Sequence, residues 1–241
     1  MNFAAVVTGA SSGIGAAIAR AMLAAGYRVV SLALDAPDWT HPALHPFRVD
    51  LGDPAATRTV AAEIADRFAI SHIVHSAGAI RPALLADVQA ADMHALTALH
   101  LVAPTLLLQA ALPGMQARKF GRIVLISSRA ALGLQTRSAY AASKAGMIAL
   151  ARTWALELAG DGITVNTIAP GPIRGTALFH DVVPEGSDAE SRLARGIPVG
   201  RLGTPEDVAR AALFFAARDA DFITGQTLFV CGGASIGSQG I

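Results

Sequence analysis

Short apolar runs rich in β-branched residues recur along the chain and predict buried strands. They begin near residues 3, 28, 72, 122, 163 and 226 and read FAAVV, RVVSLAL, HIVH, RIVLIS, ITVNTIA and QTLFV. Between them lie longer alanine-rich stretches with apolar residues at helical spacing, at residues 15–25, 54–68, 87–117, 139–159 and 205–216. Strands and helices therefore alternate. Strands that are apolar throughout are typical of a parallel sheet covered by helices on both faces.

This alternation predicts an α/β fold with a doubly wound parallel β-sheet flanked by helices, in a three-layer αβα arrangement. The 241 residues contain no internal repeat and no linker that would separate a second domain, so we expect a single domain over residues 1–241. The longest irregular segment, about residues 172–203, follows a predicted strand end, where ligands of such folds bind. We expect this segment to form a substrate lid.

Composition narrows the functional classes. Charged residues are 15% of the chain and the formal net charge is +1, which argues against nucleic acid or a membrane surface as a partner. Cys231 is the single cysteine, so no intrachain disulfide can form and a cytoplasmic location is expected. The sequence shows no signal peptide and no uninterrupted apolar run of about 20 residues, as a membrane span would need.

Three glycines lie between the first predicted strand and the first predicted helix, in the stretch VVTGASSGIGAAIARAML. Gly9, Gly13 and Gly15 would allow a tight turn and let backbone N–H groups approach a pyrophosphate at the positive end of the helix. Taken alone, such a turn could be a simple strand-to-helix connection. The spacing TGxxxGxG resembles the cofactor loop of the short-chain dehydrogenase/reductase family.

Further motifs follow in the family's order over nearly the whole chain. They are HSAG at residues 75–78, SS at 127–128, YAASK at 140–144, PGPI at 170–173 and ITGQTLFVCGG at 223–233. The resemblance implies an NAD(P)-binding Rossmann domain and an enzyme that transfers a hydride between the nicotinamide and a carbonyl or alcohol. It assigns cofactor contacts to Gly9, Ser11, Ser12, Gly13, Ile14, Gly15, Asp35, Asp50, Leu51, Ser76, Ala77, Gly78, Tyr140, Lys144, Pro170, Gly171 and Ile173.

Tyr140 and Lys144 are four residues apart and would project from the same face of a helix that begins near Ser138. A free phenol has a pKa near 10, and a nearby cation favours the phenolate and lowers that pKa. We therefore expect Lys144 to tune Tyr140 as a general acid and base. The resemblance also implies that Lys144 hydrogen-bonds the nicotinamide ribose.

Two serines end the fifth strand of the family's fold. The resemblance gives Ser128 the role of holding the substrate oxygen, to which its hydroxyl can donate as negative charge develops. Ser127 is close enough to compete for that role. We expect Ser127 to make a strand-end hydrogen bond instead.

The chain departs from the family at several positions. His100 replaces an asparagine whose backbone carbonyl holds a water of the proton relay. It either substitutes in that relay, with a titration near neutrality, or packs there as a polar residue. His75 and Ser76 replace two asparagines and are expected to keep a structural and cofactor-lining role. Cys231 replaces an aspartate and is expected to be a small buried residue rather than a reactive thiol.

The sequence leaves open the choice between NAD and NADP. Asp35 follows Gly15 by twenty residues, yet it stands two positions after the family's usual ribose-binding aspartate, where this chain has Ala33. Ser12 and Leu34 occupy positions where NADP-dependent members often carry a basic residue. The missing arginine favours NAD. No metal site is predicted.

The substrate is expected to be a small carbonyl or alcohol compound. Arg81, Arg129, Arg137 and Arg174 lie where one or two of them could bind a carboxylate or phosphate of the substrate, although each one taken separately is better explained as a solvated surface residue. Residues 178–183 offer an apolar wall. Two alternatives remain: a 3-oxoacyl thioester reductase of the acyl-carrier-protein type, and a catalytically silent nucleotide-binding regulator. The intact Ser128, Tyr140 and Lys144 argue against the regulator.

We also expect a homotetramer. The predicted helices at residues 87–117 and 139–159 carry more apolar residues than one stripe facing the sheet would use. In the resembled family these helices pack against their counterparts in a second subunit, and the C-terminal region makes another two-fold contact. The tail at residues 232–241 is small and uncharged, as such a contact would require. Two different two-fold contacts generate D₂ symmetry.

Overall fold

A computed structural model describes residues 3–237 of the chain. Seven parallel strands form one sheet in the order β3-β2-β1-β4-β5-β6-β7. The strands are β1 (Ala4–Thr8), β2 (Arg28–Ala33), β3 (Leu44–Arg48), β4 (Ile70–His75), β5 (Gly121–Ile126), β6 (Ile163–Pro170) and β7 (Thr227–Val230). The order reverses between β1 and β4, which is the switch point at which doubly wound sheets bind their ligands.

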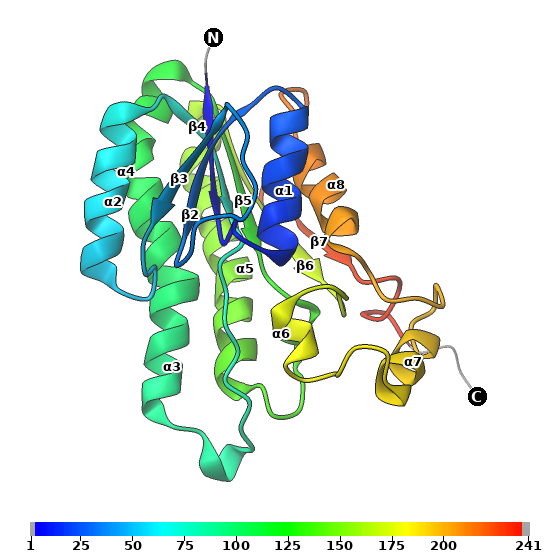
Figure 1. Ribbon diagram of the computed structural model, residues 1–241. Coiled ribbons are helices and arrows are strands. Elements are labelled where there is room, and N and C mark those ends of the chain that lie inside the picture. Colours follow the sequence, from blue (N-terminus) through cyan, green and yellow to red (C-terminus); the bar gives the residue numbers. More distant parts are fainter. Residues whose placement is uncertain (1–2, 238–241) are drawn as a thin grey trace.

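Helices cover both faces of the sheet, as the sequence predicts (Figure 1). On one face lie α1 (Gly13–Ala24) and α8 (Pro205–Ala216), which pack against each other. On the other lie α2 (Pro54–Arg67), α4 (Ala103–Arg118) and α5 (Ser138–Leu158). Each helical layer closes its own hydrophobic core against the sheet. The fold is therefore the three-layer αβα sandwich that the alternation predicts.

β1 shows why these strands read as apolar throughout. Ala4 and Val6 belong to the core beneath α2, α4 and α5, while Ala5 and Val7 belong to the core beneath α1 and α8. All four side chains are buried, because successive side chains of a strand point to opposite faces and both faces are covered.

The sequence pattern does not reveal β3. Its residues, LHPFR, alternate between half-buried and exposed, and Pro46 lies in their middle. β3 forms one edge of the sheet, where proline and polar residues are tolerated because one side of the strand makes no ladder. The five predicted helical stretches are all present, and α8 has the predicted bounds.

The helix predicted at residues 87–117 consists of α3 (Ala90–Thr97), a π turn (Ala98–Val102) and α4. By length and composition alone, Ala90–Arg118 could cross a bilayer. However, Leu107, Leu108 and Met115 are buried in the core shared with α2 and β4, so we interpret it as a core helix of this fold. The π turn matters for the site below, since such insertions often occur at functional positions.

The segment predicted as a lid leaves the body of the fold at one place and returns to the same place. A bridge joins Ile173 to Gly203, with hydrogen bonds from Arg174 N to Gly203 O and from Gly203 N to Pro172 O. Between these ends lie two short helices, α6 (Ala177–His180) and α7 (Asp188–Arg195). They lie beyond the carboxyl ends of the strands (Figure 1).

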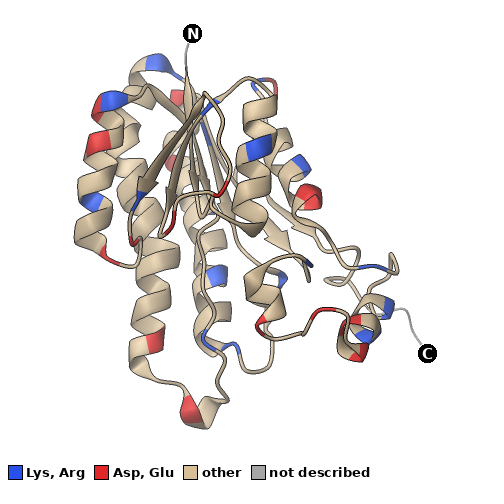
Figure 2. Cartoon of the chain, in the orientation of Figure 1, with Lys and Arg blue, Asp and Glu red and all other residues tan. Residues whose placement is uncertain are grey.

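Charged residues lie mostly on the helices and loops, with positive and negative residues interspersed (Figure 2). Helix α7 has Asp188 and Glu190 in its first turn and Arg192 and Arg195 in its last turn. This arrangement favours the helix, because the N-terminal end of a helix dipole is positive and the C-terminal end is negative. Most of the sheet carries no charge.

Candidate active site

A cavity of about 790 Å³ lies at the carboxyl ends of the strands, between the glycine loop and the segment that contains α6 and α7. It is lined by every residue that the sequence assigns to cofactor binding, together with Ser128. Only one of the predicted site residues, His100, does not line it. The fold thus brings together residues from both ends of the chain.

The glycine loop lies against the N-terminus of α1, and its geometry requires glycine at two positions. Gly9 has a φ of +66°, and a Cβ added at Gly15 would lie 2.1 Å from the carbonyl oxygen of Gly9. Side chains at these positions would be strained or would clash. The backbone is therefore open where the N–H groups of the first helical turn face the cavity, as a pyrophosphate site needs.

The adenosine end of the cavity contains Asp35 and Asp50. Asp50 accepts a hydrogen bond from Gly52 N at 2.8 Å, which fixes its carboxylate in the turn after β3. Asp35 is exposed and lies 3.8 Å from the guanidinium of Arg48, the last residue of β3. Arg48 also donates to the carbonyl of Leu34. Sequence reasoning missed Arg48, because the strand that carries it was not predicted.

His75 ties the end of β4 to its neighbours. Thr8 Oγ1 accepts hydrogen bonds from Ser76 N and Ala77 N. The same hydroxyl donates to His75 Nδ1, 3.0 Å away. On the other side of the ring, His75 Nε2 donates to Leu99 O at 3.0 Å. Burial lowers the pKa of His75 to about 3, so the ring is neutral, as this network needs. His75 thus has the structural role expected of it but does not line the cavity, whereas Ser76 does.

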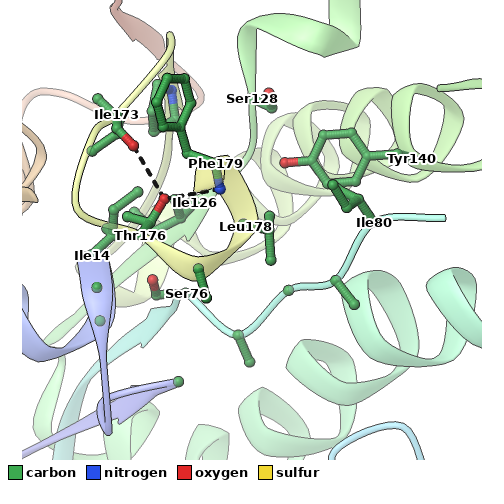
Figure 3. Close-up of a pocket in the computed structure, with 18 of the residues that line it drawn as sticks. Ile14, Ser76, Ile80, Ile126, Ser128, Tyr140, Ile173, Thr176, Leu178 and Phe179 are labelled. Carbon is green, nitrogen blue, oxygen red and sulfur yellow. Dashed lines mark hydrogen bonds between the residues drawn. The ribbon is translucent and has the colours of Figure 1, made fainter. Parts of the chain in front are cut away.

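Tyr140 lies in the first turn of α5, and Ser128 lies directly after β5. Figure 3 shows the two side chains on the same wall of the pocket, with the phenol pointing into it. Burial raises the pKa of Tyr140 above its ordinary value, while hydrogen bonding by the nearby Ser128 hydroxyl and the charge of Arg137 act in the opposite direction. Two hydroxyl groups thus converge on one point of the cavity.

Lys144 lies on the face of α5 that carries Tyr140, with Nζ 5.7 Å from the centroid of the phenol ring. Its ammonium group is buried and donates to Ile126 O at 2.8 Å. Burial lowers the pKa of Lys144 to about 7. The expectation that Lys144 lowers the pKa of Tyr140 is wrong for this structure, because the burial of both groups dominates and Lys144 is only partly charged at neutral pH.

Ser127 makes the structural bond expected of it. Its hydroxyl donates to the backbone carbonyl of Lys144 at 2.7 Å, which links the end of β5 to α5.

His100 lies in the π turn and is completely buried. Its Nε2 accepts from Ala79 N at 3.3 Å, and its Nδ1 donates to Ser143 Oγ, 2.8 Å away; Ser143 Oγ in turn donates to Tyr140 O. The rings of His100 and Tyr140 meet edge to face, with centroids 5.8 Å apart. Burial and the nearby Lys144 depress the pKa of His100 strongly. The expected titration near neutrality is therefore wrong, although the residue does lie beside Tyr140 and Lys144.

Apolar side chains from the α6–α7 segment close the other side of the cavity. They are Leu178, Phe179, Val182, Val183 and Leu193. Figure 3 shows Leu178 and Phe179 near Ser128 and Tyr140, with Thr176 accepting from Phe179 N and donating to Ile173 O. Of the four arginines considered, Arg129 and Arg137 line the cavity, whereas Arg81 and Arg174 do not.

Comparison with known proteins agrees with this geometry. A family model described as "Enoyl-(Acyl carrier protein) reductase" matches residues 9–235. The chain is 43% identical over 186 residues to the (2S)-[(R)-hydroxy(phenyl)methyl]succinyl-CoA dehydrogenase subunit BbsC of Thauera aromatica. The matched region covers 76% of this chain and 71% of that protein. It is 36% identical to the acetoacetyl-CoA reductase of Shinella zoogloeoides, over 97% of this chain and 98% of that protein.

A solved structure has the same architecture. It is described as a putative NAD(P)-dependent gluconate 5-dehydrogenase from Beutenbergia cavernae with bound NADP, and it superimposes with a TM-score of 0.88. The two sequences are 33% identical, and the match covers 95% of each chain.

Proposed function

Because the chain belongs to the short-chain dehydrogenase/reductase family, we propose that it transfers a hydride between NAD(P)(H) and the 3-position of an acyl thioester, with Tyr140 as the proton donor and acceptor. The protein is an NAD(P)-dependent oxidoreductase that acts on hydroxyl and carbonyl groups. The substrate and the roles of individual residues are the proposed part. One observation supports them: the side chains of Ser128 and Tyr140 lie together at the wall of the cavity that the glycine loop opens, close enough for Ser128 to influence the pKa of Tyr140.

In the direction of reduction, a carbonyl oxygen accepts hydrogen bonds from Ser128 Oγ and Tyr140 Oη. Both donors stabilise the negative charge that develops on this oxygen in the transition state. A nicotinamide held in the cavity would supply the hydride that the carbonyl carbon accepts. Tyr140 gives its proton to the oxygen as the alcohol forms, and in oxidation it takes the proton back.

Lys144 is the titratable neighbour that exchanges protons near neutral pH, because burial brings its pKa to about 7. We propose that it returns the proton to Tyr140 and holds the nicotinamide ribose. His100 is a positioning residue in this scheme. Both of its ring nitrogens are occupied by Ala79 and Ser143, so it fixes the loop after β4 against α5 rather than carrying protons.

The cavity fits a dinucleotide, since the glycine loop would hold the pyrophosphate and Asp50 the adenine. The sequence-based preference for NAD finds no support in similar structures, because the gluconate 5-dehydrogenase structure contains NADP. We propose that Asp35 and Arg48 together set the preference at the adenosine ribose. The carboxylate would repel a 2′-phosphate and the guanidinium would attract it.

A thioester substrate is supported by the wall and by the relatives. The α6–α7 segment presents apolar side chains to the cavity, as an acyl chain would need. The names of both relatives reported above refer to coenzyme A thioesters. One of these thioesters bears a hydroxyl group, and the other is an acetoacetyl thioester.

The test is a turnover panel in both directions with NAD and NADP. It contains 3-oxoacyl thioesters, their 3-hydroxy counterparts, simple ketones and sugars. We expect kcat/KM to be highest for the thioesters. If sugars or simple ketones react fastest, the thioester proposal is wrong, and if the cofactor binds and nothing reacts, the silent regulator replaces it.

A further inference from the structure

The cavity has an uneven distribution of charge. Of its lining residues, the acidic ones are Asp35 and Asp50, both at the adenosine end. Beside Ser128 and Tyr140 the charged lining residues are Arg129, Arg137 and Lys144, all cationic. The part of the cavity that takes the substrate therefore has positive charge without a lining carboxylate to balance it.

Arg137 is the unusual member of this group because it is buried, with 9% of its surface exposed. Its hydrogen bonds use one nitrogen, Nη1, which donates to Thr136 O and Thr136 Oγ1. Among residues 3–237 it forms no ion pair with a carboxylate within 4.0 Å. Buried arginines are rare unless they are paired, since desolvating a charge is unfavourable. The remaining guanidinium donors are available to a ligand in the cavity.

The backbone holds Arg137 in place before any substrate arrives. The residue lies directly before α5, three positions ahead of Tyr140, and its carbonyl accepts from Ala141 N. A bridge joins it to Ala83 in the loop after β4, and Ala83 N donates to Thr136 O. The charge of Arg137 reaches the phenol of Tyr140, where it favours the phenolate. Arg137 is thus a rigidly placed cation next to the reacting group.

We propose that Arg137, assisted by Arg129, binds a carboxylate of the substrate, so that the preferred substrate is an acyl thioester bearing a free carboxylate close to its reacting carbon. This inference rests on the proposed function and adds a specificity determinant to it. A planar guanidinium with two free donors matches a carboxylate, and the bond is charge-assisted and partly screened from water. Neutral acyl chains would leave the cation unpaired and are discriminated against.

The test compares acids with their own methyl esters, which keep the carbon skeleton and remove the charge. One pair is 3-oxoadipyl-CoA and its ester, with the carboxylate at the chain end. The other pair has a carboxymethyl branch on carbon 2 of acetoacetyl-CoA. Each pair is also prepared as the N-acetylcysteamine thioester, which lacks the phosphates of coenzyme A. Acetoacetate and methyl acetoacetate form a further pair that contains no thioester.

For the wild-type protein we expect kcat/KM for an acid to exceed that for its ester by about 10- to 100-fold in at least one thioester pair. Arg137→Gln should lower kcat/KM for the acid by a similar factor and change that for the ester by less than about threefold. Arg137→Lys should keep part of the preference because the charge remains. Arg81→Gln is the matched control, since Arg81 is exposed, pairs with Asp92 and lies outside the cavity, and should change neither rate.

Other outcomes would overturn the proposal. Equal losses for acid and ester in Arg137→Gln, with a lower free energy of unfolding, would mean that Arg137 only supports the Thr136 turn. Losses with coenzyme A thioesters but not with N-acetylcysteamine thioesters would mean that it binds the phosphates of coenzyme A. A third result would be that thioesters do not react, that acetoacetate reacts faster than methyl acetoacetate, and that Arg137→Gln abolishes this difference. The proposed thioester substrate would then be wrong, while Arg137 would still be a carboxylate site.

Discussion

At the scale of single residues, the burial of Lys144 opposes the stability of the fold. Its amine is buried, forms no ion pair among residues 3–237, and has its pKa lowered from 10.5 to about 7 by burial. Between these two values the unfolded chain binds more protons than the folded one. The contribution of Lys144 to the free energy of unfolding of the cofactor-free protein therefore rises as the pH increases from about 7 to 10.5.

Replacing Lys144 by methionine should stabilise the cofactor-free protein at pH 7 while removing activity. We expect a gain of about 2–4 kcal/mol in the free energy of unfolding, after the loss of the hydrogen bond to Ile126 is subtracted. Urea unfolding of both proteins at pH 7 and near pH 10 measures it. The gain should shrink at the higher pH, where the folded-state lysine is uncharged and the unfolded-state lysine begins to lose its proton. A gain independent of pH would show that burial of the charge is not its source.

We expect single residues to decide the cofactor preference as well. Asp35→Ala should shift the ratio of kcat/KM for NADP over NAD upward by about three- to fivefold, because an exposed carboxylate repels the 2′-phosphate only weakly. Arg48→Ala should shift the same ratio downward by a similar factor. Steady-state kinetics with both cofactors gives these ratios, and Arg20→Ala, at an arginine that stacks on Trp39 and does not line the cavity, serves as control. Unchanged ratios in both variants would place the selectivity elsewhere.

At the scale of elements, the π turn at Ala98–Val102 is positioned by His100, whose side chain joins the loop after β4 to α5. His100→Ala removes two hydrogen bonds and leaves a cavity, so we expect the free energy of unfolding to fall by about 2–4 kcal/mol. Ser143→Ala, which removes one partner, should cost less. His100→Asn should recover part of the activity.

The pH profile separates this positioning role from a proton-carrying one. Because the pKa of His100 is strongly depressed, activity should show no inflection from its titration between pH 6 and 8. An inflection near pH 6.5 in the wild-type protein that disappears in His100→Asn would return His100 to the proton relay.

Elements whose pattern is strongly apolar could be predicted from sequence, whereas elements shaped by their tertiary surroundings could not. The start of α5 at Ser138 and the extent of α8 follow from the helical spacing of the apolar residues. β3 was not predicted because an edge strand needs no continuous apolar run. The cavity brings together the predicted cofactor residues because their motifs lie at strand ends. The pKa values of Tyr140 and Lys144 depend on burial, which no local pattern reports.

At the scale of the whole molecule, burial decides which apolar side chains are open to a contact between subunits. Met147, Ala151 and Ala155 of α5 are buried in the subunit's own core, so they contribute nothing to a contact between subunits. Leu156 is 87% exposed, and Phe222, near the β7 edge of the sheet, is 100% exposed. Residues 238–241 of the tail lie outside the described part of the chain. Exposed apolar side chains on α5 and near β7 still offer two separate contact regions.

We expect a homotetramer with one contact on each region. Light scattering at micromolar concentration should give about four times the 24.7 kDa of the chain. Leu156→Asp and Phe222→Asp should each reduce the mass to that of a dimer, because each removes one of two different isologous contacts. A monomer in the unmodified protein would contradict the expectation outright.

The central claim is that Tyr140 transfers the proton while the rest of the cavity binds and orients. Tyr140→Phe removes one hydroxyl and keeps the ring that packs against His100. Turnover of the best substrate should fall by about 10²- to 10⁴-fold, with the Kd for the cofactor, measured by fluorescence titration, unchanged. Turnover close to that of the unmodified protein, with the cofactor bound normally, would contradict the account.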